Sequence, residues 1–278
     1  MNARPATLPV THIRPGSRAM SFTADEVWQA RELLYFLVWR DIKVRYKQTV
    51  LGIAWSVLQP FLTMVVFTIF FGRLAKVPSD GVPYPLFSLA ALVPWTYFST
   101  AVSNGSSSLV GNQHLIAKVY FPRVLVPLAA VVMPAVDLAV SFGMVIVLMA
   151  WYHVAPAPAM LLLPLYVGLV VLTALAVTLW TSALSVRYRD ARYVLPFLIQ
   201  IWLFLTPVAY PASMVPERWR LLYALNPMAT VVEGFRSSLL GTPSPAAMAA
   251  VAAAVVAGAL VAGTAYFRSV EGSIVDLA

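Results

Sequence analysis

The amino-acid sequence predicts an all-α integral membrane protein with six transmembrane helices in each subunit. The chain of 278 residues is 60% hydrophobic and only 11% charged, and its mean hydropathy is +0.80. Soluble domains carry about 25% charged residues, so this composition excludes an ordinary soluble protein. Several windows contain no Asp, Glu, Lys or Arg, for example residues 48–72 and 81–117. Each is longer than the ~20 residues that a helix needs to cross about 30 Å of hydrocarbon.

The charge-free windows place the predicted transmembrane domain at residues 48–268. Its six expected spans are 51–71, 85–104, 124–151, 159–185, 194–211 and 246–267. An even number of spans puts both termini on one side of the membrane. If that side is the cytoplasm, 14 basic residues lie inside and 5 lie outside. The positive-inside rule therefore predicts two cytoplasmic termini.

The segment before the first span divides into two parts. Residues 1–24 contain three prolines and scattered arginines, which predicts a disordered cytoplasmic tail. The sequence TADE at residues 23–26 matches a capping box, so we expect a basic, amphipathic interfacial helix at 25–47. Its cations near the membrane are Arg40, Lys43, Arg45 and Lys47. The helix is either a simple anchor or a moving part. At the other end, residues 269–278 form a second cytoplasmic tail.

A short cytoplasmic helix is expected between the second and third spans, within residues 104–123. Small polar residues at 104–108 should end the second span, and Pro122 should stop the helix. The helix would expose Leu115, Ile116, Val119 and Tyr120 beside Lys118. A short, half-apolar element that joins two spans is suited to transmit force from a soluble motor. An ordinary interfacial loop helix fits the same residues.

The external segment 211–241 is too apolar for a plain loop, but prolines and charges interrupt it. We expect two short helices that follow Pro216 and are separated between Asn226 and Pro227. Two acid–arginine pairs have i,i+3 spacing, which would partly neutralise them. They are Glu217 with Arg220 and Glu233 with Arg236. The segment is interpreted as a re-entrant hairpin that covers a passage, or as a folded external cap without one.

Two further features of the spans suggest function. Asp137 lies near the middle of the third expected span, where a carboxylate costs several kcal/mol unless it is paired, hydrated or protonated. It serves either in transport or as a structural hydrogen-bond partner. Nine aromatic residues cluster in the first, second and fifth spans. They are Phe67, Phe70, Phe71, Trp95, Tyr97, Phe98, Trp202, Phe204 and Tyr210. Their rings could line a channel for a glycan, or they could form an interfacial belt.

The sequence lacks the motifs of ATP-binding and metal-binding proteins. The chain has no cysteine, no GxxxxGK[ST] phosphate loop and no clustered metal ligands, so we expect no metal site and no ATP site of its own. The basic residues flank spans, which argues against nucleic-acid binding and for membrane lipid as their partner. The stretch VRYRDARYV, residues 186–194, is expected to be a cytoplasmic turn anchored by tyrosines.

Five stretches together resemble the permease subunit of ABC-2 exporters, in the branch that moves O-antigen, capsular or teichoic-acid-like polysaccharides. They are VRYKQTVLGIAWSVLQP (44–60), FFGRLAKVPSDGVPYPLF (70–87), LIAKVYFPRVLVP (115–127), VRYRDARYVLPFLIQIWLFLTPVAYP (186–211) and LNPMATVVEGFR (225–236). The resemblance covers about residues 25–268, in the same order and spacing. The arginine–tyrosine block followed by the fifth span is its most specific part.

This resemblance implies a homodimer in the bacterial inner membrane, joined to two copies of a separate ATPase that binds ATP and Mg. The substrate would be an undecaprenyl-pyrophosphate-linked polysaccharide that passes between the subunits. Residues 105–122 would form the coupling helix, the helix 25–47 would border the cytoplasmic entrance, and 216–240 would form the external gate. The expected coupling residues are Asn112, Leu115, Ile116, Lys118, Val119, Tyr120, Arg187, Arg189, Asp190 and Arg192. We expect the four cations of residues 40–47 to meet the pyrophosphate.

Three other classes of protein share some of these features. A membrane glycosyltransferase or polymerase could act on the same lipid carrier, but it would need clustered carboxylates, whereas the external glutamates accompany arginines. A drug-exporting ABC-2 permease usually has a larger external domain. A scaffold that transports nothing is the third alternative. The sequence therefore favours an export permease that is not itself an enzyme.

Overall fold

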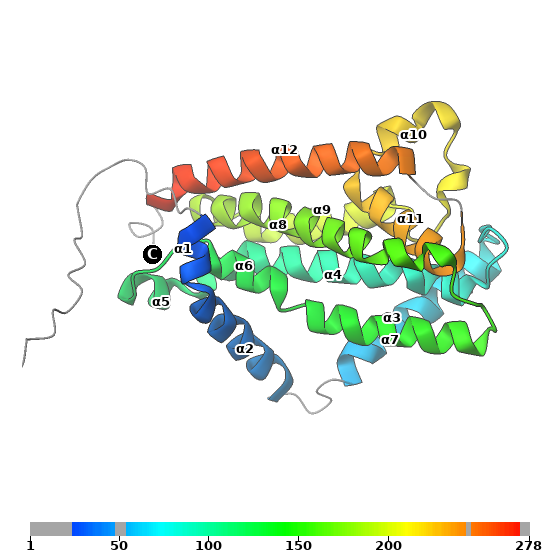
Figure 1. Cartoon of the computed structure of the whole chain (residues 1–278), viewed down its shortest axis with the longest axis horizontal. Coiled ribbons are helices and arrows are strands. Elements are labelled where there is room, and N and C mark those ends of the chain that lie inside the picture. Colours follow the sequence, from blue (N-terminus) through cyan, green and yellow to red (C-terminus); the bar gives the residue numbers. More distant parts are fainter. Residues whose placement is uncertain (1–23, 48–53, 243–245, 273–278) are drawn as a thin grey trace, which may run out of the picture.

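The computed structural model describes residues 24–47, 54–242 and 246–272, and this part of the chain folds into helices without a strand. The long helices run roughly side by side along one axis, so that α5 and α10 lie at opposite ends of the bundle (Figure 1). Five helical stretches are long and apolar enough to cross a membrane. They are Ala54–Leu74, Tyr84–Gly111, Leu125–Trp151, Pro158–Arg187 and Met248–Glu271.

Helix α4 (Tyr84–Gly111) is the central element, and most of its residues are buried. It extends well past residue 104, where small polar residues were expected to end it, so that expectation was wrong. The hydroxyl groups of Ser106 and Ser108 donate hydrogen bonds to carbonyls three residues earlier, which satisfies them inside the helix. Gly105 allows the close approach of α8, because a Cβ atom there would lie 2.3 Å from a methyl carbon of Thr178.

The first and third expected spans are both interrupted helices. Helix α3 (Ala54–Phe67) continues into a π-helical segment, η1 (Thr68–Leu74). The third span consists of α6 (Leu125–Val132) and α7 (Ala135–Trp151), which meet at Pro134. A proline lacks the N–H that would continue the hydrogen-bond ladder. Asp137 consequently lies in the first turn of α7. It is also close to the middle of the whole span Leu125–Trp151, as expected.

The fourth span is η2 (Pro158–Leu162) followed by α8 (Leu163–Arg187), and the last is α12 (Ala246–Glu271). The fifth expected span, 194–211, differs from its prediction. Helix α9 (Ala191–Leu205) has 15 residues, or about 22 Å at ~1.5 Å per residue. It ends because Thr206 precedes Pro207 and is extended, with φ −108° and ψ 140°. Residues 206–211 then form irregular backbone.

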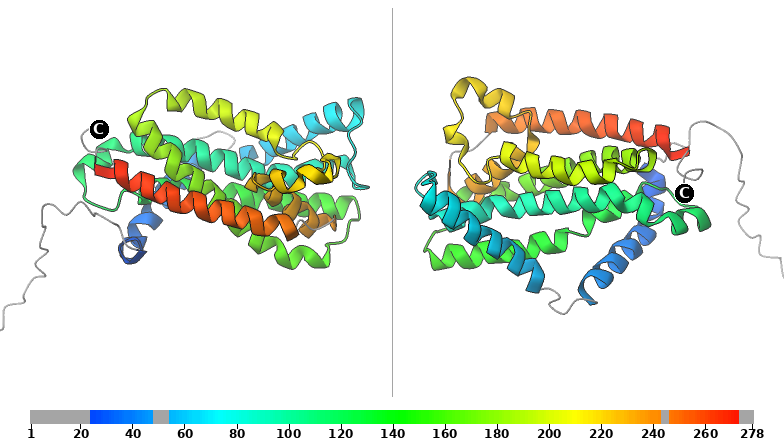
Figure 2. Two further views of the ribbon diagram at one scale, coloured as in Figure 1. Left: turned by 90° about the horizontal axis from the view of Figure 1, so that it is seen from above. Right: turned by 180° about the vertical axis from the view of Figure 1, so that it is seen from behind.

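Shorter helices lie at both ends of the bundle. Near α5 (Gln113–Lys118) are α1 (Ala24–Gln29) and α2 (Arg31–Lys47), and α2 packs against α6. The opposite end carries η3 (Ala212–Met214), α10 (Glu217–Tyr223) and α11 (Pro227–Leu240) (Figure 2). Helix α2 is not simply amphipathic as expected, because its apolar side chains occupy two faces. Leu37 is buried against protein, whereas Tyr35 and Phe36 are exposed.

The buried side chains form two hydrophobic clusters. The larger one surrounds the middle of α4 and includes residues of α7, α8, α9 and α11. The smaller one joins α2, α5 and α6 with the ends of α8 and α12. Each end of the bundle is therefore fixed by its own packing, and the polar groups described below lie beside these two clusters.

Candidate functional site

A cavity of about 660 Å³ lies between α2, α4 and α6. Three kinds of side chain line it: charged groups from α2, small polar groups from α4 and apolar groups from α6. They include Arg40, Asp41, Arg45, Asn104, Ser107, Asn112, Val126, Ala129 and Met133. Guanidinium, amide and hydroxyl groups are the donors that bind phosphate and sugar oxygens. The cavity can therefore accommodate a polar, anionic group next to an apolar wall.

Arg40 connects α2 to the end of α4. Its Nη2 atom lies 2.8 Å from Oδ1 of Asp41, and it also donates a hydrogen bond of 2.9 Å to Oδ1 of Asn112. Asn112 in turn donates from Nδ2 to the carbonyl of Ser108, so the amide is held in place from both sides. Asn112, which was expected among the ATPase-coupling residues, forms part of the cavity wall.

Arg45 forms the second ion pair, with Asp137 of α7. The distance between Nη2 of Arg45 and Oδ2 of Asp137 is 2.8 Å. The hydroxyl groups of Tyr46 and Ser56 both donate to Oδ1 of the same carboxylate. Burial and the hydrogen bond to Asp137 raise the pKa of Tyr46, so its phenol remains a donor at neutral pH. Asp137 thus has partners from α2 and α3, which agrees with its interpretation as a structural hydrogen-bond partner of neighbouring helices.

The other two expected entrance cations lie outside the cavity lining. Lys43 lies over the ring of Trp39, with Nζ 5.2 Å from the ring centroid, and Lys47 is exposed at the end of α2. The structure therefore brings two of the four expected cations together. Because the side chains of Arg40 and Arg45 are 36% and 32% exposed, their ion pairs remain accessible to water and to solutes.

Helix α5 is shorter than the expected coupling helix 105–122, since α4 occupies the first part of that range. Its residues point in different directions. Ile116 is buried and Leu115 packs against the smaller cluster, whereas Lys118, Val119 and Tyr120 are exposed. Tyr120 is 83% exposed. Four charged residues at the α8–α9 turn are exposed as well: Arg187, Arg189, Asp190 and Arg192.

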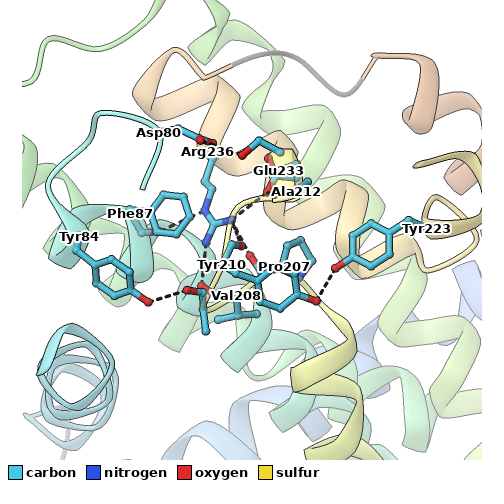
Figure 3. A network of polar contacts seen from close by, with 12 residues as sticks. Asp80, Tyr84, Phe87, Pro207, Val208, Tyr210, Ala212, Tyr223, Glu233 and Arg236 are labelled. Atoms are coloured by element: carbon cyan, nitrogen blue, oxygen red, sulfur yellow. Dashed lines mark hydrogen bonds and ion pairs between the residues drawn. The ribbon is translucent and has the colours of Figure 1, made fainter. Parts of the chain in front are cut away.

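At the opposite end, the buried guanidinium of Arg236 organises the irregular segment after α9 (Figure 3). It donates hydrogen bonds to the carbonyls of Pro207 at 2.6 Å and Val208 at 2.8 Å. It also pairs with Glu233 at 2.9 Å and stacks 3.5 Å from the ring centroid of Phe87. The i,i+3 spacing predicted the pair with Glu233. The carbonyls of residues 207 and 208, which no helix satisfies, thus have an internal donor.

Asn226 is the second polar residue that fixes this segment. Its Oδ1 accepts from the backbone N–H of Met228, which caps α11, and from Nε1 of Trp202. Its Nδ2 donates to the carbonyl of Leu205 and to the hydroxyl of Thr206. The expected gate residues Asn226, Glu233 and Arg236 therefore act as structural connections in the described conformation.

The remaining expected gate residues contribute less to this network. Pro227 is buried, while Pro216 and Arg220 are exposed. The side chain of Glu217 lies outside the described part of the chain, so its expected pair with Arg220 does too. Tyr210 and Tyr223 share a hydrogen bond of 2.9 Å between their hydroxyl groups, which connects the segment to α10.

The nine aromatic residues proposed for a channel fall into three groups. Trp95, Tyr97 and Phe98 are at most 6% exposed and belong to the larger hydrophobic cluster, so their side chains line no surface of the subunit. Phe70 and Phe204 are about 60% exposed. The partly buried members of the set are Phe67, Phe71, Trp202 and Tyr210. Packing accounts for the first group, and the channel assignment is wrong for these three residues.

The sequence did not single out several residues of these two sites. Ser56 and Tyr46 hold Asp137, and the hydroxyl of Tyr84 donates to the carbonyl of Ala209 at 2.7 Å. Each lies on a different element of the chain from its partner. A single-span hydropathy pattern gives no signal for such contacts. The one local signal was the proline at position 207, which marks backbone that needs outside donors.

The fold and composition define a polytopic, all-helical membrane protein whose long helices surround α4. A family model for ABC-2 type transporters matches residues 32–240, and the chain therefore belongs to this family. Members of this kind are permease subunits that are not themselves enzymes, and the ATPase is a separate chain. The chain is accordingly a multi-pass membrane permease subunit.

Named relatives are similar over most of their length. The chain is 33% identical to the O-antigen export system permease protein RfbA of Myxococcus xanthus, over 76% of this chain and 82% of that protein. It is 28% identical to the O-antigen export system permease protein RfbA of Klebsiella pneumoniae, covering 74% and 79%. The polysialic acid transport protein KpsM of Escherichia coli is 22% identical, covering 72% and 78%.

Proposed function

We propose that this chain is the membrane subunit of an ATP-driven exporter that moves an O-antigen-like polysaccharide from the cytoplasm across the bacterial inner membrane. The observation that carries this proposal is the 33% identity to an O-antigen export permease over 76% of the chain. A relative named for polysialic acid transport supports the same class of cargo. The distribution of basic residues supports two cytoplasmic termini, with α5 on the cytoplasmic side.

The cavity between α2, α4 and α6 is proposed to receive the head of the lipid carrier, an undecaprenyl pyrophosphate. A diphosphate would be bound by Arg40 and Arg45, while Asn104, Ser107 and Asn112 donate to the first sugar. Both guanidinium groups already contact carboxylates, those of Asp41 and Asp137. The phosphates would compete with these carboxylates for the two guanidinium groups, and they would add negative charge to the cavity.

The separate ATPase is proposed to dock on α5 and on Tyr120, two residues after the end of this helix. An exposed tyrosine next to Lys118 provides an apolar ring and a charge that a protein groove can hold. ATP and Mg²⁺ would be bound by the ATPase, with two copies of it for each transporter. The exposed arginines of the α8–α9 turn would form a second contact with it.

A homodimer is proposed as the working unit, with the polysaccharide passing between two copies of the chain. The segment η1 and helix α9 both expose apolar side chains, including Phe70 and Phe204, which a second copy or a sugar face could contact. The hairpin of α10 and α11, which we propose to be re-entrant, would then close the external end. Because Arg236 holds the segment 206–211, this closure would move the hairpin and that segment together.

The proposal is tested by ATP hydrolysis in proteoliposomes that contain this chain, its candidate ATPase and a lipid-linked polysaccharide. Hydrolysis should require both proteins and should be stimulated by the lipid-linked polysaccharide. Tyr120→Ala should weaken the stimulation, while the control Trp219→Ala, at an aromatic residue 50% exposed on α10 at the other end of the bundle, should have a smaller effect. The proposal would be contradicted if the chain did not bind the ATPase, or if the polysaccharide did not stimulate ATP hydrolysis.

A further inference from the structure

A second cavity, of about 540 Å³, is a groove between α3–η1 and α7. Its walls are apolar: Phe61 and Ile69 line one side, and Val147 lines the other. These side chains are 41%, 43% and 66% exposed, so the groove opens sideways from the bundle. Met64 is 5% exposed and forms its floor. The groove is separate from the cavity that contains Arg40 and Arg45.

The length of the groove matches one leaflet of a bilayer. The twelve residues from Phe61 to Arg73 advance by less than about 18 Å, because η1 is π-helical and rises less per residue than the ~1.5 Å of an α-helix. Half of a hydrocarbon core about 30 Å thick is ~15 Å. The apolar part therefore runs from near the middle of the membrane to the end of the bundle that carries α10, as an acyl chain in that leaflet does.

The outer end of the groove has the chemistry of the headgroup level. Arg73 lines it there, together with Trp151 and Tyr152 at the end of α7. Tryptophan and tyrosine mark the membrane–water interface. Within the described residues, Arg73 has no hydrogen bond or ion pair. A guanidinium presents a fork of donors that fits a phosphate group.

We propose that this groove binds one anionic phospholipid, with an acyl chain between α3 and α7 and its phosphate at Arg73. Charge complementarity selects an anionic lipid, because Lys76 adds a second exposed cation beside Arg73 and a zwitterionic headgroup would bring its own cation against them. A second copy of this chain is a poorer occupant, since its apolar surface would remove Arg73 from water without supplying a counter-charge.

The test is native mass spectrometry of the purified full chain, titrated with phosphatidylglycerol and, separately, with phosphatidylcholine. The wild-type chain should retain one phosphatidylglycerol with clear preference over phosphatidylcholine. Arg73→Gln should weaken retention of phosphatidylglycerol roughly tenfold, as expected for the loss of one charge-assisted hydrogen bond. Arg73→Lys should keep part of the preference. The matched control Lys76→Gln removes a nearby exposed cation that does not line the groove, and it should have a smaller effect.

A second variant distinguishes this site from ordinary lipid around the protein. Val147→Trp places a large ring in the groove at an exposed position, so it should displace the retained lipid while the chain keeps its Tm. Equal retention of both lipids by the wild-type chain would overturn the proposal, and so would an unchanged preference in Arg73→Gln. If Val147→Trp and Arg73→Gln abolish dimerisation and leave lipid retention unchanged, the groove binds a second copy of the chain and not a lipid.

Discussion

Two arginine–carboxylate pairs have nearly the same geometry but very different surroundings. The Arg45–Asp137 pair has a distance of 2.8 Å, and its guanidinium, 32% exposed, lines a cavity. The Arg236–Glu233 pair has a distance of 2.9 Å, and its guanidinium is buried and surrounded by backbone carbonyls. The distance between the charges therefore says little about what a pair does. Exposure and the other partners decide it.

The guanidinium of Arg236 is buried, so water cannot replace Glu233 as its partner. The guanidinium of Arg45 is open to water, which can replace Asp137. Removing one partner from a buried pair leaves an uncompensated charge and costs about 3–5 kcal/mol. In the Arg45–Asp137 pair the carboxylate is buried as well, at 8% exposed, but it keeps hydrogen bonds from Tyr46 and Ser56, and water can reach the guanidinium of Arg45. We therefore interpret Arg236–Glu233 as structural and Arg45–Asp137 as exchangeable for an anionic ligand.

The largest expected effect follows from Arg236→Gln. This change leaves Glu233 buried without its counter-charge and leaves the carbonyls of Pro207 and Val208 without their donor. Stability should fall by about 3–5 kcal/mol, measured as a lower Tm of the purified protein. Arg218→Gln is the matched control, since Arg218 is exposed on nearby α10 and stacks on Trp219. Equal Tm values for the two variants would show that the buried pair is not structural.

Asn226→Ala should have the next largest effect. It removes the cap of α11 and the partners of Trp202 and Thr206 in one step. We expect a loss of about 1–3 kcal/mol, typical of buried polar groups left without partners. The same Tm measurement on Gln200→Ala, an exposed amide of α9, provides the baseline. If the two changes prove equally mild, Asn226 does not hold α9 to α11.

The accuracy of the sequence prediction depends on how local each interaction is. Charge-free windows located the apolar segments, because hydropathy is a property of consecutive residues. The pair of Glu233 with Arg236 was also predictable, since one helical turn brings both side chains to the same face. Arg45 and Asp137 lie on α2 and α7, and only the packing of those helices brings them together. Their pairing could therefore not be predicted from the sequence of either segment alone.

The ends of elements were the least predictable part of the fold. The small polar residues after position 103 suggested the end of a span, but their hydroxyl groups bond within α4 and the helix continues. The fifth span was predicted too long because its apolar residues continue beyond Pro207, where the helix has already ended. Apolar composition alone does not distinguish a helix from irregular backbone whose carbonyls have buried donors.

Changes to the Arg45–Asp137 pair should affect ligand binding more than stability. Asp137→Asn removes the carboxylate that competes for Arg45. Binding of an undecaprenyl-pyrophosphate-linked glycan should therefore tighten several-fold. Arg45→Gln should weaken the same binding. Both should lower the Tm by less than Arg236→Gln does, because Tyr46 and Ser56 still donate to residue 137. Binding measured by glycan-dependent changes in tryptophan fluorescence provides the comparison, and a loss of Tm as large as that of Arg236→Gln would contradict the distinction.

The smallest effect is expected for Lys47→Gln. Lys47 is exposed at the end of α2 and does not line the cavity. Stability should change by no more than about 0.5 kcal/mol, as for other surface substitutions. The concentration of lipid-linked glycan that half-saturates binding should also stay close to that of the wild-type chain. A shift as large as that of Arg45→Gln would mean that general positive charge, and not the cavity, attracts the ligand.

The central claim is that this permease moves a lipid-linked polysaccharide by way of the cavity between α2, α4 and α6. The most direct measurement is ATP-dependent accumulation of an undecaprenyl-pyrophosphate-linked glycan inside inverted vesicles that contain the chain and its ATPase. We predict accumulation that requires both proteins, is reduced by Arg45→Gln and is unaffected by Lys47→Gln. ATP hydrolysis without accumulation of glycan would contradict the claim. So would equal accumulation with the wild-type chain, Arg45→Gln and Lys47→Gln.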